Sequence, residues 1–149
     1  MAGSLYLLDT NILLRWVQPR DSDYGTVAAA LDVLARDGAI LCYTSQNLGE
    51  FWNACTRPLE RNGFGLSPHD AGRKARLFET RLRLLQENPS VHDEWRQILL
   101  TYNVSGNQVH DARLVAVMRV HDVGRILTFN EKDFVRYSSI QAVNPRLVS

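Results

Sequence analysis

Residues 4–11 read Ser-Leu-Tyr-Leu-Leu-Asp-Thr-Asn. The apolar run that ends at Leu8 has no helical spacing and is typical of a short buried strand. Thr10 and Asn11 are residue types that commonly cap the start of a helix. The stretch therefore predicts a strand that passes directly into a helix, with the carboxylate of Asp9 at the junction.

The same order of strand and helix recurs once more in the first half of the chain. Apolar residues within 27–34 fall on one helical face, and Gly38 follows where such a helix would end. Residues 39–43 are again a compact apolar run, and Thr44 with Ser45 can cap the following helix. Strand and helix thus alternate twice before residue 58.

The second half predicts further helices and two more strands. Apolar spacing indicates one helix over residues 71–85 and another over 90–102, which together would form a helical hairpin. A helix that begins near Asp111 follows, and residues 125–128 and 140–143 have the pattern of strands. Strands separated by helices favour a three-layer α/β/α sandwich with a central, mainly parallel sheet. We expect a single domain over residues 1–149.

Composition narrows the classes of protein further. The 149 residues carry a formal net charge of +1 and 45% hydrophobic residues, as in an ordinary globular protein. The apolar run that ends at Leu8 is too short for a signal peptide or a membrane span, so we expect a cytoplasmic protein without membrane attachment. Cys42 and Cys55 form no Cys-x-x-Cys pair, which argues against structural zinc.

Four acidic residues occupy positions where ligands bind in open parallel sheets, beyond the carboxyl ends of the strands. Asp9 ends the first strand, Glu50 lies in the helix after the second, Asp111 opens a later helix, and Asp133 follows the strand of residues 125–128. Helical spacing points Glu50 away from the apolar face of its helix, toward water or a cleft. Clustered carboxylates suit Mg²⁺ or Mn²⁺, because these cations prefer oxygen ligands.

Each acid also has a purely structural explanation. Asp9 could cap a helix, Glu50 could be a solvated helix residue, and Asp111 and Asp133 are acids near helix starts, where the helix dipole favours negative charge. Only the joint placement of the four favours a metal site. His110 is adjacent to Asp111, but a lone histidine at such a position is more commonly structural.

The order of four motifs resembles the PIN-domain family, and within it the short VapC-type toxins of toxin–antitoxin pairs. The motifs are Leu7-Leu8-Asp9-Thr10-Asn11, Asn47-Leu48-Gly49-Glu50-Phe51, Val109-His110-Asp111-Ala112 and Thr128-Phe129-Asn130-Glu131-Lys132-Asp133-Phe134. Together they span nearly the whole chain.

The resemblance implies that Asp9, Glu50 and Asp111 are catalytic acids that bind the metal. The family often has a fourth acid two positions after the threonine of the last motif, where this chain has Asn130. Either Asn130 or Asp133 could complete the site. By the same resemblance, Asn11, Thr128 and Asn130 are expected to contact substrate or to orient the metal ligands.

What the resemblance implies about activity is metal-dependent hydrolysis of RNA phosphodiester bonds by an endoribonuclease that leaves a 5′-phosphate. It also implies a homodimer and a cognate antitoxin protein that inhibits the enzyme. Two alternatives stay open. A Mg²⁺-dependent phosphatase or phosphotransferase would also gather aspartates at strand ends, although it usually needs Asp-x-Asp and position 11 is Asn. A catalytically weak PIN domain could instead serve as an RNA- or protein-binding module.

Overall fold

The computed structural model describes residues 3–149 of the chain. Its centre is a five-stranded sheet in which every pair of neighbours is parallel, with the order β3-β2-β1-β4-β5. The strands are β1 (Leu5–Leu8), β2 (Ile40–Thr44), β3 (Arg83–Leu85), β4 (Arg125–Leu127) and β5 (Gln141–Val143).

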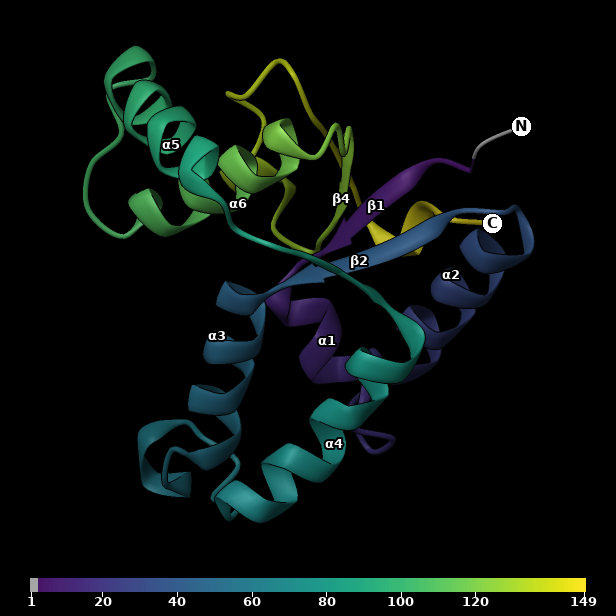
Figure 1. Cartoon of the computed structure of the whole chain (residues 1–149). Helices are drawn as coiled ribbons and strands as arrows, with labels where there is room; N and C mark the ends of the chain where they lie inside the picture. Colours follow the sequence, from purple (N-terminus) through teal and green to yellow (C-terminus); the bar gives the residue numbers. More distant parts are fainter. Residues whose placement is uncertain (1–2) are drawn as a thin grey trace.

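Helices cover both faces of this sheet, as Figure 1 shows with α5 and α6 above it and α1, α3 and α4 below. The α-helices are α1 (Thr10–Trp16), α2 (Tyr24–Arg36), α3 (Ser45–Thr56), α4 (Pro68–Arg81), α5 (Pro89–Thr101) and α6 (Gln108–Val120). The described residues also contain three short 3-10 helices, namely η1 (Leu59–Arg61), η2 (Glu131–Asp133) and η3 (Pro145–Leu147). The predicted three-layer α/β/α sandwich with a parallel sheet is confirmed.

Two hydrophobic cores form because successive strand side chains point to opposite faces. On β1, Leu7 packs with residues of α5 and α6, whereas Leu8 packs with residues of α1, α2, α3 and α4. Ile126 and Leu127 of β4 divide in the same way. The central strands β1, β2 and β4 therefore contribute to both cores, which explains the continuous apolar runs of the sequence.

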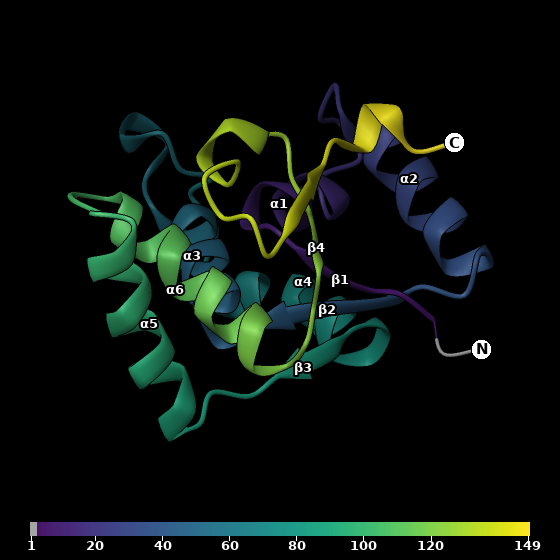
Figure 2. The ribbon, with the colours of Figure 1, turned by 90° about the horizontal axis from the view of Figure 1, so that it is seen from above.

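The chain changes direction in the sheet beside β1. It moves from β1 to β2 and β3 on one side, then returns to place β4 and β5 on the other side. Leu8 is the register partner of Leu127, so the residues that follow them, Asp9 and Thr128, leave the sheet at the same edge. Figure 2 shows β1 between β2 and β4 from above. Such a switch point is where open α/β sheets bind ligands.

The predicted helical hairpin over residues 71–85 and 90–102 is wrong. Helix α4 ends at Arg81, residues 83–85 form β3 beside β2, and α5 packs against α6 on the other face of the sheet. Leu85 keeps the apolar spacing of the α4 face, yet it packs into the core opposite to that of Phe78. The chain crosses from one face of the sheet to the other at this point, which spacing alone does not reveal.

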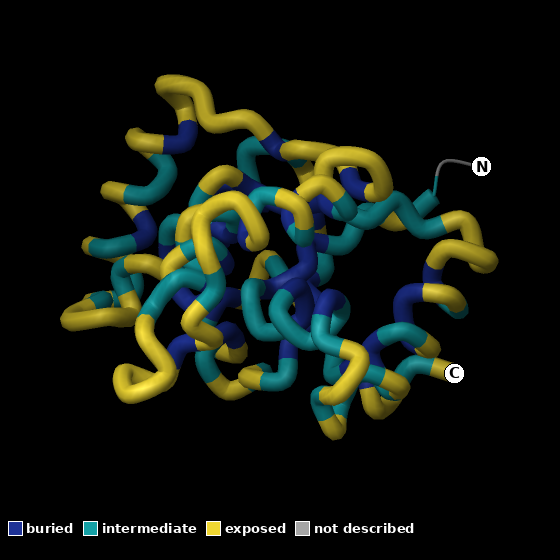
Figure 3. Tube along the Cα trace, turned by 90° about the horizontal axis from the view of Figure 1, so that it is seen from below, coloured by how far each residue is buried: buried dark blue, intermediate teal, exposed yellow. Residues whose placement is uncertain are grey.

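Burial follows the layers. Figure 3 shows buried residues in the centre of the molecule and exposed residues on the outer loops and helix surfaces. Helix α6 is the most enclosed helix, with buried side chains from Leu114 through Met118. Within residues 3–149, no helix combines the length and the apolar character needed to span a membrane.

Phe78 of α4 offers a test of the core that contains residues of α1, α2, α3 and α4. Its ring is fully buried and lies near the rings of Trp16, Tyr43 and Phe51, at centroid distances of 6.2, 6.3 and 4.8 Å. Phe78→Ala is expected to lower the free energy of unfolding by about 3–5 kcal/mol, measured by urea denaturation. The control is Leu100→Ala, at a side chain that is 72% exposed, where a change within about 0.5 kcal/mol is expected. Similar losses in both variants would contradict this packing.

Candidate active site

Asp9 lies at the end of β1 and caps α1. Its Oδ1 accepts a hydrogen bond from the backbone N–H of Thr10 at 2.8 Å, and its Oδ2 accepts one from the Thr128 hydroxyl at 2.7 Å. The Asn11 amide donates to the same Oδ2 at 3.3 Å. Burial raises the pKa of Asp9, while the bonds from Thr128 and Thr10 act in the opposite direction. Asp9 is the N-cap residue of α1, which confirms the cap interpretation of Asp9, and the alternative that Thr10 or Asn11 caps this helix is wrong.

Thr128 joins β4 to this carboxylate. It is fully buried, and its hydroxyl oxygen accepts from the backbone N–H of Asn130 at 2.9 Å while donating to Asp9. The Asn11 amide also reaches this hydroxyl at 3.3 Å. Asp9, Asn11 and Thr128 thus form one polar cluster across the β1 and β4 ends.

Glu50 of α3 is held from two sides. Its Oε1 accepts from the Thr10 hydroxyl at 2.7 Å, and its Oε2 accepts from the Gln46 amide at 3.2 Å. Glu50 therefore faces the start of α1 and lies near enough to Asp9 to raise the pKa of Asp9. Its spacing on α3 predicted only that it would face water or a cleft. It is not simply a solvated helix residue.

Asn47 supports this arrangement from beneath. Asn47 lies three residues before Glu50 and is fully buried, whereas Asn53, three residues after Glu50, is exposed. Its Oδ1 accepts from the Thr44 N–H at 2.9 Å in a capping box, and its Nδ2 donates to the Thr10 hydroxyl at 3.1 Å. Asn47 thereby orients the hydroxyl that binds Glu50.

Gln46 connects Glu50 to the helix that carries Asp111. Its side-chain N–H group donates to Glu50 and also to the backbone carbonyl of His110, at 2.8 Å, while its Oε1 is buried without a hydrogen bond in the described structure. Trp95 fixes the same turn from α5, because its indole N–H donates to the Val109 carbonyl at 2.9 Å. The start of α6 is therefore anchored from both neighbouring helices.

The roles of Gln46 and Asn47 were missed from the sequence. The Thr44-x-x-Asn47 spacing resembles a capping box and could have indicated the buried amide. The partner of Gln46 lies 64 residues away, so no local pattern indicates it.

The other three predicted acids act together on the carboxyl group of Asp111. Burial, together with the carboxylates of Asp9, Asp133 and Glu50, raises the pKa of Asp111 to about 7. Glu50 and Asp133 also raise the pKa of Asp9. The fold thus brings carboxylates from the β1 end, α3, α6 and η2 to one edge of the sheet, where they repel one another.

The two candidates for the fourth position differ in character. Asn130 is exposed, precedes η2 and binds Thr128 through its backbone N–H. Asp133 is partly buried and adds negative charge at both Asp9 and Asp111. Of the two side chains, only that of Asp133 adds a negative charge near Asp9 and Asp111.

The donor set fits a hard divalent cation. Carboxylate oxygens are the ligands that Mg²⁺ and Mn²⁺ prefer, and a cation would offset the repulsion that raises the pKa of Asp111. In the described part of the chain, no three Asp, Glu, His or Cys side chains already stand close enough to hold an ion. Any closure on a cation would therefore involve side-chain movement, and Glu50 would have to exchange part of its hydrogen bonding to Thr10 and Gln46.

Comparisons with known proteins agree with the α/β/α fold. The family model described as PIN domain matches residues 6–139, which is most of the chain. The chain therefore belongs to the PIN domain family. No curated protein matches its sequence.

Solved structures share the fold at low sequence identity. The structure of VapBC2 from Rickettsia felis, bound to a DNA fragment from the promoter, has a TM-score of 0.71 at 18% identity, with coverage of 94% of this chain and 98% of that chain. DNA-bound VapBC from Salmonella typhimurium gives 0.70 at 17%, with coverage of 97% and 99%. The sarcin-ricin loop cleaving toxin VapC20 of Mycobacterium tuberculosis gives 0.65 at 17%, with coverage of 89% and 95%.

The pKa of Asp111 predicts how stability depends on pH without metal. In the unfolded chain this carboxyl ionises near its ordinary pKa of 3.8, and in the folded protein at about 7. The unfolded state therefore loses the proton first, and Asp111 lowers stability progressively between these two values. Asp111→Asn is expected to raise the free energy of unfolding at pH 8 by about 1–2 kcal/mol, a figure reduced for solvent screening of a partly exposed group.

The measurement is urea denaturation in EDTA at several pH values. At pH 4 the variant and the wild type should differ little, because Asp111 is then largely protonated in the folded state. Asp93→Asn, at an exposed position on α5, is the control and should show no comparable pH-dependent gain. A destabilised Asp111→Asn at pH 8 would show that repulsion does not dominate at this position.

Proposed function

We propose that the chain is a Mg²⁺- or Mn²⁺-dependent endoribonuclease. The observation that carries this proposal is the meeting of four carboxylates at the switch point of the sheet, where they raise the pKa of Asp111 to about 7. Membership of the PIN domain family supports a nuclease. The similar fold of a toxin that cleaves the sarcin-ricin loop supports RNA as the substrate.

Asp9, Glu50 and Asp111 are the residues that would hold the ion, and Asp133 is the fourth carboxylate. A bound Mg²⁺ or Mn²⁺ would supply an activated water nucleophile and would neutralise negative charge on the phosphate oxygens. Without a cation, the acids would repel the substrate phosphate. Binding of cation and RNA is therefore expected to be coupled.

The remaining side chains act by holding the acids in place. Thr128 and Asn11 both donate to Oδ2 of Asp9, which limits rotation of that carboxylate. Thr10 and Gln46 each donate to a different oxygen of Glu50. In the proposed reaction the oxygen of water forms a bond to phosphorus and the bond to the 3′ oxygen breaks. The products are a 5′-phosphate and a 3′-hydroxyl, and the proton lost by water balances the one gained by the leaving oxygen.

We also propose that the enzyme is the toxin of a toxin–antitoxin pair. The structural neighbours include VapBC proteins of several bacteria, which supports a partner antitoxin and a VapC-type role. Cytoplasmic RNA would be the target, and a homodimer the active form. A cognate antitoxin would inhibit the enzyme by blocking access to the acidic edge.

The first test is cleavage of a structured RNA by the purified protein. We expect cleavage with Mg²⁺ or Mn²⁺, none with EDTA, and a fall in kcat/KM of at least about 100-fold in Asp9→Asn and Asp111→Asn. Asp133→Asn should reduce kcat/KM more than Asn130→Ala does, if Asp133 is the fourth carboxylate. Product ends are checked by phosphatase sensitivity and labelling.

The control in that assay is Asp93→Asn, which should cleave like the wild type. Circular dichroism confirms that each variant is folded. Equal cleavage by Asp9→Asn and the wild type would refute the assigned site, and RNA binding without cleavage by the wild type would favour the binding-module alternative.

The toxin role has a separate test in living cells. Induced expression of the wild type in a bacterial host should arrest growth and cut host RNA, because free enzyme would meet no antitoxin. Asp111→Asn at equal soluble yield should leave growth unaffected. Normal growth with an active wild-type enzyme would argue for a specialised processing nuclease instead of a toxin.

A further inference from the structure

A second polar network lies beside the candidate active site and centres on the Phe129 ring. The guanidinium carbon of Arg15 lies 5.1 Å from the ring centroid, and that of Arg146 lies 4.7 Å from it. Both distances are in the range of cation–π contacts. We call Arg15, Asp23, Phe129 and Arg146 the arginine clamp.

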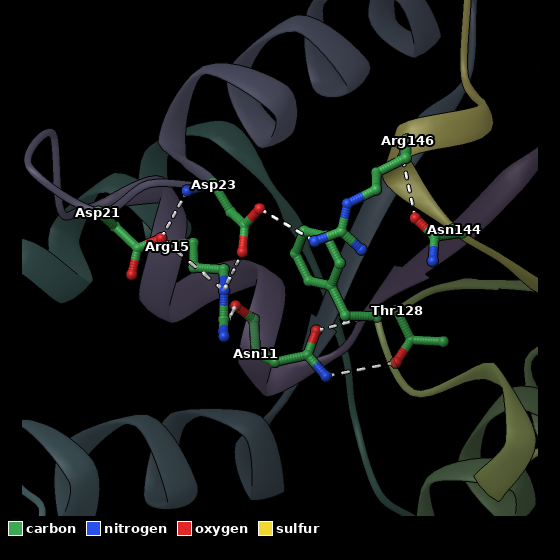
Figure 4. A network of polar contacts seen from close by, with 8 residues as sticks. Asn11, Arg15, Asp21, Asp23, Thr128, Asn144 and Arg146 are labelled. Atoms are coloured by element: carbon green, nitrogen blue, oxygen red, sulfur yellow. Dashed lines mark hydrogen bonds and ion pairs between the residues drawn. The ribbon is translucent and has the colours of Figure 1, made fainter.

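Asp23 links the two arginines. Its Oδ2 lies 3.4 Å from Nε of Arg15, and its Oδ1 lies 3.1 Å from Nη2 of Arg146. Asp21 orients Asp23 by accepting its backbone N–H at 2.8 Å. Figure 4 shows Asp23 between Arg15 and Arg146. Asp23 thus bridges two cations that contact the same ring, and Oδ1 of Asp21, 3.9 Å from Nε of Arg15, adds a second carboxylate beside Arg15.

The clamp reaches the site through Asn11. The backbone N–H of Phe129 donates to Oδ1 of Asn11 at 3.3 Å, and Arg15 donates to the Asn11 carbonyl at 3.0 Å. The amide nitrogen of Asn11 then donates to Asp9 and to Thr128, each at 3.3 Å. All three side-chain bonds of Asn11 are at or beyond the long end of the usual range, so none of them alone fixes the amide.

The backbone around Arg146 is held by contacts outside the clamp. Helix η3, which carries Arg146, packs against α2, and the backbone N–H of Arg146 donates to Asn144 at 2.9 Å. The Asn144 amide donates in turn to Glu131 of η2 at 2.8 Å. The clamp therefore joins α1, the α1–α2 connection and the segment after β5 around one aromatic ring.

We propose that the arginine clamp positions Asp9 for cation binding, with Asp23 and Arg146 as positioning residues that act through Phe129 and Asn11. This inference rests on the proposed function, because it concerns the same carboxylate. The arginines of the clamp contact the Phe129 ring, and Arg15 also binds the Asn11 carbonyl. These contacts restrain the side-chain amide of Asn11, and that amide restricts the position of Oδ2 of Asp9. Neither Asp23 nor Arg146 contacts the reacting atoms.

The positioning role of the clamp can be distinguished from a contribution to folding stability. Ion pairs with exposed members contribute little to folding, and the Arg146 side chain is 55% exposed. Loss of the clamp is therefore expected to change overall stability only slightly. A small displacement of a metal ligand is expected to lower cation affinity much more than it lowers folding stability. In other proteins, side chains that hydrogen-bond to metal ligands have large effects on metal affinity.

The experiment measures Mn²⁺ binding to the full chain by isothermal titration calorimetry. Asp23→Asn and Arg146→Met are each expected to raise the Kd for Mn²⁺ about tenfold. The matched control is Asp32→Asn, which removes an exposed pair with Arg36 on the same helix α2. That control should bind Mn²⁺ like the wild type.

Two further variants examine the pathway. The double variant Asp23→Asn/Arg146→Met should bind Mn²⁺ no more weakly than the worse single variant, because both changes open one clamp. Arg146→Lys should recover part of the affinity, since it keeps the charge facing Asp23 and loses the planar contact with the ring. With RNA, at Mn²⁺ concentrations that saturate each variant, the single variants should lower kcat about tenfold and leave KM nearly unchanged.

Each contrary result has a distinct meaning. An unchanged Kd and kcat in both Asp23→Asn and Arg146→Met would overturn the proposal. A raised KM with unchanged Kd and kcat would also overturn it, because the clamp would then contact RNA directly. If the wild type binds no Mn²⁺, the proposed function fails, and NMR tests the clamp alone. The Asn11 side-chain and Phe129 backbone amide signals should then shift in Asp23→Asn and not in Asp32→Asn, and unshifted signals would overturn the clamp.

Discussion

Repulsion among carboxylates at one edge of the sheet is the constraint on which the rest of the site depends. Burial and three neighbouring acids raise the pKa of Asp111 to about 7, which shows how strongly the fold opposes a fourth charge there. A sequence that keeps such a cluster sacrifices stability in the metal-free state. The surrounding hydroxyl and amide donors make the arrangement possible, because each of Asp9 and Glu50 has its oxygens held by hydrogen bonds.

These donors form two connected groups around the acids. Thr10 of α1 and Gln46 of α3 hold Glu50, and Asn47 donates to the Thr10 hydroxyl. Gln46 extends this group to the start of α6. Asn11 of α1 and Thr128, which follows β4, hold Asp9. The helix-cap and functional interpretations of Asp9 are therefore compatible, because its Oδ1 caps α1 while its Oδ2 faces the polar cluster.

The layers of the fold and the placement of four acids at one edge of the sheet could be predicted from the sequence. Strand periodicity is a local pattern, and the rule that ligands bind at the carboxyl ends of parallel strands is general. The sequence did not predict β3, because Leu82 and Leu85 continue the helical spacing of α4 while the chain crosses to the other face. Nor did it predict Gln46 or the arginine clamp. Those contacts join residues such as Asp23 and Arg146, 123 positions apart, which no spacing pattern connects.

The bond between Asp9 and Thr128 spans 119 residues and closes the centre of the sheet. Contacts of this length form late in folding, because the chain must first pay a large entropic cost to bring such distant segments together. A nascent chain on the ribosome would hold Asp9 and Glu50 long before β4 emerges. The acids would then lack the strand that unites them, so the cluster is complete only after β4 has been synthesised.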